Sequence, residues 1–312
     1  MNKKTLLANG LLLLTAFIWG LGFVSQRAGM AYVGPFTFNG SRFLLAALVL
    51  VPVTIFINRS KKAKEADLEF VTGKKKEKKR LLLGGVCCGT MLFCGSSLQQ
   101  IGLVYTTASK SAFITALYIV LVPLFSLFLG HRPGIRSWIG VFLGAIGLYM
   151  LCMNESFHIA TGDLVVLVGA LFWTGHVLCV DHFLGWGVDS VKLSLLQFSF
   201  CTIVGFLFMF LFEDPSIEAL KSCALLIFYS GCLSAGVGFT LQIIGQKYTS
   251  PTVASLLMSM ESVFGALAGV VILHEHLTGK ELGGCIFMFS AIIISQLPAK
   301  LKHTDTKPDA LP

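Results

Sequence analysis

Uncharged, mostly apolar runs of about 20 residues recur along almost the whole chain. A helix of that length crosses the roughly 30 Å of hydrocarbon in a bilayer, because each residue adds about 1.5 Å. Ten such runs occur, separated by short clusters of polar, Gly or Pro residues, at 6–25, 36–57, 81–104, 107–130, 138–153, 164–183, 191–212, 224–246, 252–273 and 281–297. We therefore predict an all-α polytopic membrane protein with ten transmembrane helices.

The composition agrees with a chain that is solvated mainly by lipid. Charged residues make up 13% of the sequence, against about 25% in soluble domains, and the mean hydropathy is +0.79. The longest polar segment, 58–80, is too short and too rich in lysine to bury a core, so no soluble catalytic domain is expected. No small-x-small cleavage site precedes Arg27, so the first run is predicted to be a span, not a signal peptide.

Basic residues gather on one side of the ten-span arrangement. That side carries 19 of the 24 Lys and Arg residues, whereas the other side has Arg27, Lys221 and Lys280. Basic loops are retained in the cytoplasm, so both termini are predicted to be cytoplasmic, with the protein in the plasma (inner) membrane. The basic loop 58–80 is expected to contact anionic lipid, and no nucleic-acid partner is predicted.

The chain contains an internal repeat. Residues 98–106 match 241–249 at six of nine positions, and Trp19 in the first span has a counterpart, Trp173, in the sixth. We predict two five-helix units, 1–153 and 154–299, followed by a cytoplasmic tail, 300–312. Five crossings turn the second unit upside down relative to the first, which is the inverted-repeat plan of secondary transporters.

Several segments carry a family resemblance: residues 17–23 (Phe-Ile-Trp-Gly-Leu-Gly-Phe), 42–44 (Arg-Phe-Leu), 105–123 and 245–252 (Gly-Gln-Lys-Tyr-Thr-Ser-Pro-Thr). In these segments the chain resembles the EamA-type transporters of the drug/metabolite transporter (DMT) superfamily. The resemblance implies ten helices, a central cavity between the repeats, and export of amino acids or other small metabolites.

The chain departs from that family at one position. The family's Glu-Pro in the second repeat is here Glu261-Ser262, whereas the first repeat keeps Pro123. We therefore expect span 107–130 to kink at Pro123 and span 252–273 to bend less.

A few polar and aromatic side chains within the spans are candidates for binding or coupling, because an ionisable group at membrane depth costs about 3 kcal/mol. They are Trp19, Arg42, Lys110, Tyr118, Trp173, His176 and Glu261. Arg42 and Lys110, expected in the same half of the bilayer, favour a solute with a carboxylate or phosphate. Glu261, near the midplane, is predicted to be the functional acid, either unpaired or paired with Lys110. Structural roles remain open: an ion or carbonyl pair for Arg42, a hydrogen bond for His176, and packing for the two tryptophans.

Other chemistry finds little support in the sequence. There is no Gly-x-x-x-x-Gly-Lys motif for ATP, and residues 274–276 (His-Glu-His) are interpreted as a polar helix end instead of a metal site. We predict no cofactor, no metal and no catalytic residue.

The function predicted is secondary transport, exporting a small metabolite such as an amino acid by alternating access. The alternative is a non-transporting membrane protein, either an embedded enzyme or an assembly subunit. A homodimer is left open.

Overall fold

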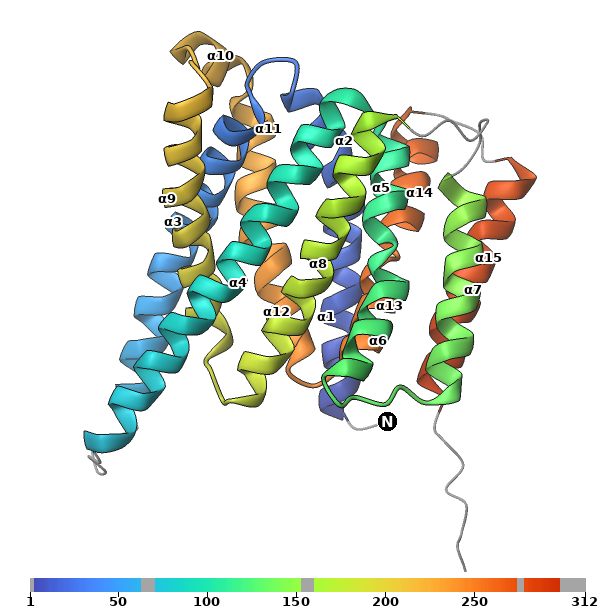
Figure 1. Ribbon diagram of the computed structural model, residues 1–312, viewed down its shortest axis with the longest axis horizontal. Coiled ribbons are helices and arrows are strands. Elements are labelled where there is room, and N and C mark those ends of the chain that lie inside the picture. Colours follow the sequence, from blue (N-terminus) through green and yellow to red (C-terminus); the bar gives the residue numbers. More distant parts are fainter. Residues whose placement is uncertain (1–2, 63–70, 153–159, 274–277, 298–312) are drawn as a thin grey trace, which may run out of the picture.

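The described residues of the computed structural model, 3–62, 71–152, 160–273 and 278–297, form helices joined by short connections and contain no strand. Figure 1 shows the helices lying side by side as one bundle, with the connections at its two ends. Seven helical stretches are long and apolar enough to cross a membrane, and 135–151 and 251–267 are shorter apolar helices. Large apolar side chains point outward, such as Phe128 and Phe210. The protein is therefore a multi-pass membrane protein.

The first half of the chain begins with α1 (Lys3–Gly20), α2 (Gly22–Gly29) and α3 (Pro35–Lys62). It continues with α4 (Val71–Tyr105), α5 (Ala108–Ala116), α6 (Tyr118–Phe128) and α7 (Ile135–Cys152). The second half has α8 (Thr161–Gly185), α9 (Ser190–Phe212), α10 (Ile217–Ser222), α11 (Ala224–Phe228), η1 (Tyr229–Phe239), α12 (Thr240–Gln246), α13 (Pro251–Met258), α14 (Glu261–Leu273) and α15 (Gly279–Gln296). Each predicted span overlaps either one of these helices or several helices that follow one another along the chain.

Three of the predicted continuous spans are interrupted. The first span breaks at Leu21, between Gly20 and Gly22, where glycine lowers helix stability. Span 107–130 breaks at Leu117, and α6 continues through Pro123, so the expected kink lies upstream of the proline.

Span 252–273, which we expected to bend less because it lacks proline, is also interrupted, between Met258 and Glu261. Here Ser255 and Ser259 donate hydroxyl hydrogen bonds to carbonyls three residues earlier, of Thr252 and Leu256. Such bonds compete with regular helical bonding and bend a helix without proline.

Small residues allow close helix contacts. α7 packs along α15. α4 packs against both α8 and α9, and α3 packs against α9. A Cβ atom on Gly147 would lie 2.7 Å from the carbonyl oxygen of Gly284, so α7 and α15 touch through their backbones. A Cβ atom on Gly140 or Gly144 would also lie less than 3.0 Å from a neighbouring helix, so these glycines allow close packing.

Glu213 holds the start of α3. Its carboxylate accepts hydrogen bonds from the amide nitrogens of Phe36 and Thr37, at 2.8 and 2.7 Å, and from the Thr37 hydroxyl at 2.6 Å. Because the first amides of a helix have no partner within the helix, this carboxylate caps α3 and ties it to the end of α9. Arg42 lies two turns further along α3.

Candidate substrate cavity

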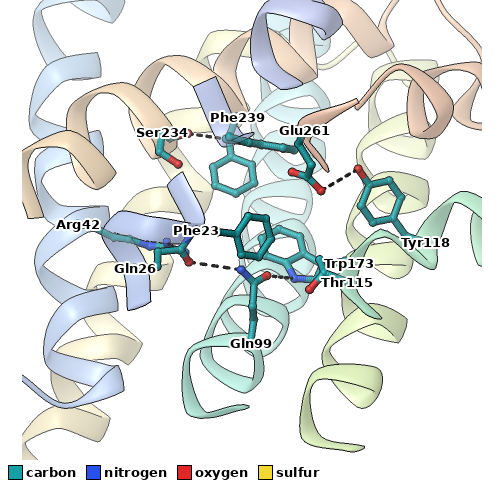
Figure 2. Close-up of a pocket in the computed structure, with 11 residues that line it drawn as sticks. Phe23, Gln26, Arg42, Gln99, Thr115, Tyr118, Trp173, Ser234, Phe239 and Glu261 are labelled. Atoms are coloured by element: carbon teal, nitrogen blue, oxygen red, sulfur yellow. Dashed lines mark hydrogen bonds between the residues drawn. The ribbon is translucent and has the colours of Figure 1, made fainter. Parts of the chain in front are cut away.

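A cavity of about 430 Å³, including its open mouth, lies in the interior of the bundle. Both halves of the chain contribute to its wall, and the lining residues are Trp19, Phe23, Gln26, Arg42, Gln99, Thr115, Tyr118, Trp173, Ser234, Phe239 and Glu261. Figure 2 shows aromatic rings and polar ends facing the same space. Mostly apolar walls that carry a few polar groups are typical of small-molecule sites.

Arg42 is the cation of the cavity. Its side chain is 3% exposed and donates a hydrogen bond from Nη1 to Oε1 of Gln26 at 3.0 Å. The guanidinium also lies 4.8 Å from the centre of the Phe43 ring, within the range of a cation–π contact. Among the described residues, no partner is found for its Nε atom, and no carboxylate forms an ion pair with it. Arg42 therefore has hydrogen-bonding capacity left for an anionic group.

Three amide and indole groups extend from Arg42 along the wall. Gln99 contacts Gln26 through an Nε2 to Oε1 distance of 3.4 Å, and the indole nitrogen of Trp173 donates to Oε1 of Gln99 at 2.9 Å. Behind the wall, Gln100 donates to the backbone carbonyl of Gln26 at 3.0 Å. Figure 2 shows the contacts of Gln99 with Gln26 and Trp173, which help to hold Gln26 beside Arg42.

Glu261 is the acid of the cavity. It is the first residue of α14 and is 4% exposed. The Tyr118 hydroxyl, at the first residue of α6, lies 3.4 Å from its Oε1 atom (Figure 2). The two helix interruptions described above thus bring a phenol and a carboxyl together at the cavity wall. An acid and a cation in one small cavity can bind opposite charges on a single solute.

The two tryptophans belong to different halves of the chain and contact the other half. Trp19 donates its indole hydrogen to the carbonyl of Ser234 in η1 at 3.0 Å. Trp173 stacks on Phe239 with ring centres 5.7 Å apart and an interplanar angle of 7°. Trp19 lies 4.8 Å from the same Phe239 ring. These rings form the apolar wall of the cavity.

Five of the seven residues predicted from the sequence line the cavity; Lys110 and His176 do not. Lys110 lies in the first turn of α5, where its amide is capped by the Thr107 hydroxyl. His176 is fully buried behind Trp173 and hydrogen-bonds Gln197 at 3.0 Å. Asp181, on the same helix, lies 3.3 Å from Nε2 of His131.

The sequence prediction missed several polar lining residues, chiefly Gln26, Gln99 and Ser234. Gln99 carried a usable signal, because it is one of the residues repeated between the halves. Gln26 and Ser234 carried none, because a single amide or hydroxyl in an apolar span is compatible with many positions. Residues 274–276 lie outside the described residues. Among the described residues, no group of three His, Cys, Asp or Glu side chains could hold a metal ion.

The family comparison covers this architecture almost completely. The model of the EamA-like transporter family matches residues 6–153 and 160–296. The chain belongs to the EamA-like transporter family. This EamA protein is therefore a membrane transporter, with a small molecule as its substrate, and is not an enzyme. The family sets aside the alternative of a non-transporting membrane protein.

Individual relatives agree with this assignment. An uncharacterized transporter of Archaeoglobus fulgidus is 29% identical, covering 94% of this chain and 87% of the relative. A protein of Salmonella typhimurium described as a probable amino-acid metabolite efflux pump is 23% identical, with 94% and 96% covered. A solved crystal structure superimposes with a TM-score of 0.73 at 19% identity, covering 95% of this chain and 98% of that one, which supports the fold.

Proposed function

We propose that this EamA protein is a secondary transporter that exports a small zwitterionic metabolite, such as an amino acid, through the cavity between its two halves. Arg42 binds the carboxylate of the solute, Glu261 binds its ammonium group, and Trp19 and Trp173 contact its side chain. Tyr118 orients the Glu261 carboxyl group. We assign no solute contact to Lys110, because it lies outside the cavity lining.

The observation that carries the proposal is the state of Arg42. A guanidinium that is 3% exposed, with an Nε atom that has no partner among the described residues, is costly to keep in a membrane protein. A carboxylate is its best partner, because the planar fork of arginine matches the two oxygens. The description of the Salmonella relative, a probable amino-acid metabolite efflux pump, supports the same class of solute.

We further propose that the chain is two inverted repeats of five spans, 1–153 and 154–299, which move by alternating access. One support is a pair of equivalent contacts. Thr106 donates to Asp163, and Thr249 donates to Asn9 at 2.9 Å. Thr249 follows Thr106 by 143 positions, the offset of the sequence repeat, and Asp163 follows Asn9 by 154, the offset of the two tryptophans.

Two more correspondences obey the same offsets. Glu261 follows Tyr118 by 143 positions, so the hydrogen bond in the cavity joins equivalent residues of the two units. Gly238 follows Gly95 by the same number, and each lies against a tryptophan of the opposite unit. In Figure 1 the chain enters α1 and α8 from opposite ends of the bundle, which supports inversion.

The remaining parts of the proposal follow from charge. We propose ten spans in the plasma membrane with both termini cytoplasmic, and contact between the basic loop 58–80 and anionic lipid. A homodimer is compatible with this arrangement, and no nucleic acid takes part.

Uptake of radiolabelled amino acids into proteoliposomes tests the proposal, with each of the twenty common amino acids measured in turn. Arg42→Gln should weaken apparent affinity for the transported amino acid about 10- to 100-fold, because a charge-assisted hydrogen bond contributes about 1.5–3 kcal/mol. Arg42→Lys should retain part of the affinity, since it keeps the charge without the planar fork.

The matched control is Arg27→Gln. Arg27 lies outside the cavity lining and bonds the carbonyl of Leu103 at 2.6 Å. The Arg27→Gln substitution removes the same charge from the same half of the chain and should leave the affinity for the amino acid unchanged. Equal affinity in Arg42→Gln and the wild type, or no flux of any amino acid, would contradict the proposal.

A further inference from the structure

A second polar cluster lies beside the cavity, further along α8 toward the α8–α9 connection. It consists of His176 on α8, Gln197 on α9, and Gln242 and Gln246 on α12, and we call it the inner cluster. All four side chains are at most 3% exposed. None of them lines the cavity described above.

The inner cluster is incompletely bonded. His176 Nε2 contacts Gln197 Oε1 at 3.0 Å, Gln242 donates to Gln246 at 3.0 Å, and Gln246 donates to the carbonyl of Val177. Within the described residues, His176 Nδ1, Gln197 Nε2 and Gln242 Oε1 have no partner. Unpaired polar atoms in a membrane interior carry a desolvation cost, so a merely structural cluster would be expected to pair them.

The inner cluster occupies in the second unit the place of the cavity network in the first. Gln242 is the repeat counterpart of Gln99. Gln197 follows the first residue of α9 by seven positions, as Arg42 follows the first residue of α3. Each is followed by a phenylalanine, and these two rings stack on one another at 6.1 Å. The two networks are thus related by the repeat, one open to a cavity and one closed.

Two stacked rings separate the networks. Trp173 and Phe239 line the cavity, and the His176 ring lies nearly perpendicular to both, with ring centres 6.1 and 5.9 Å apart. Figure 2 shows Trp173 and Phe239 facing the cavity. Separation of these two rings would join the cavity to the inner cluster.

We infer that His176, Gln197 and Gln242 form a second binding site for the solute, which opens to the opposite side of the membrane when the halves rock. This inference rests on the proposed function. The unpaired amide donor of Gln197 suits the solute carboxylate, and the unpaired oxygen of Gln242 suits its ammonium group. Because the counterpart of Arg42 is here an uncharged glutamine, this site holds the carboxylate more weakly than the cavity does.

Cysteine accessibility tests the inference without any solute. Gln242→Cys and its repeat counterpart Gln99→Cys are placed in a chain whose native cysteines are replaced by serine or alanine. A membrane-impermeant methanethiosulfonate is added to right-side-out and to inside-out vesicles. Each cysteine should react from one side, and the two sides should be opposite. A minor open state of about 0.1–10% would slow the reaction of Gln242→Cys about 10- to 1,000-fold relative to an exposed cysteine.

Ile243→Cys is the negative control, because Ile243 is fully buried beside Gln242 in an apolar cluster and should react from neither side. A second variant tests whether the stacked rings separate the two networks. Adding Phe239→Ala to the Gln242→Cys chain should let this cysteine react from the side of the membrane from which Gln99→Cys reacts. The inference is overturned if Gln242→Cys reacts from neither side while Gln99→Cys reacts, or from the same side as Gln99→Cys. Absence of amino-acid flux would contradict the proposed solute, but the labelling result would still test whether the inner cluster opens to the opposite side.

Discussion

Arg42 is bound by groups that compensate only part of its charge. One amide oxygen, from Gln26, and the face of the Phe43 ring are its contacts, and its Nε atom has none within the described residues. Burying a charge in a membrane helix costs about 3 kcal/mol, and neutral partners recover less of that cost than an anion does. The physical state of this single residue therefore favours a solute that brings its own carboxylate.

Glu261→Gln should lower transport of amino acids and spare the fold. The amide keeps the size of the side chain and can still accept a hydrogen bond from Tyr118, but it cannot attract an ammonium group. Losing a charge-assisted bond of about 1.5–3 kcal/mol corresponds to a 10- to 100-fold weaker apparent affinity. Flux in proteoliposomes measures this, and Glu218→Gln, on the exposed α10, serves as control. Wild-type affinity in Glu261→Gln would remove the residue from the site.

Broken helices bring the cavity residues together at the element scale. Tyr118 begins α6 and Glu261 begins α14, so each stands at an interruption where the chain changes direction. Gly20, just before the break at Leu21, lies against the same point: a Cβ atom there would be 2.6 Å from the Glu261 carbonyl oxygen. An unbroken helix would not place the first residue of a helix at the cavity wall.

Glu213→Ala should destabilise the protein by removing the cap of α3. Three hydrogen bonds hold this carboxylate to the first turn, and loss of an N-terminal cap costs about 0.5–2 kcal/mol. Thermal unfolding in detergent should show a lower midpoint than the wild type. Asp214→Ala, an exposed neighbour, is the control and should unfold like the wild type. An equal midpoint for the two variants would show that Glu213 does not stabilise α3.

The whole molecule is organised around contacts between its halves. Tyr118 meets Glu261, Trp19 meets Ser234, and Trp173 meets Gln99. A cavity at such a boundary can change its access when the halves move, whereas a cavity within one half cannot without unfolding. The charge distribution predicts how the protein is oriented in the membrane, because basic connections gather at one end of the bundle.

Lys76→Cys should react with an impermeant maleimide in inside-out vesicles and not in intact cells, because the basic segment is predicted to be cytoplasmic. Lys76 is exposed at the start of the apolar part of α4. Glu218→Cys lies on α10 together with Lys221, which is predicted on the other side, and should show the opposite pattern. Labelling of Lys76→Cys from outside intact cells would reverse the proposed orientation.

The sequence alone was sufficient for the apolar spans, the family and five of the cavity residues. Runs without charge predict helices in lipid, because an unpaired backbone or a charge there is costly over a whole segment, and repeated residues predict a duplication. It did not predict the break at Ser259, the place of His176 behind Trp173, or the contact of Tyr118 with Glu261. Those depend on which helix faces meet, and an apolar helix that is covered by lipid or protein on every side has no amphipathic pattern to reveal its inward face. Tertiary packing decided which polar groups share one cavity, because residues 143 positions apart come together only when the two halves assemble.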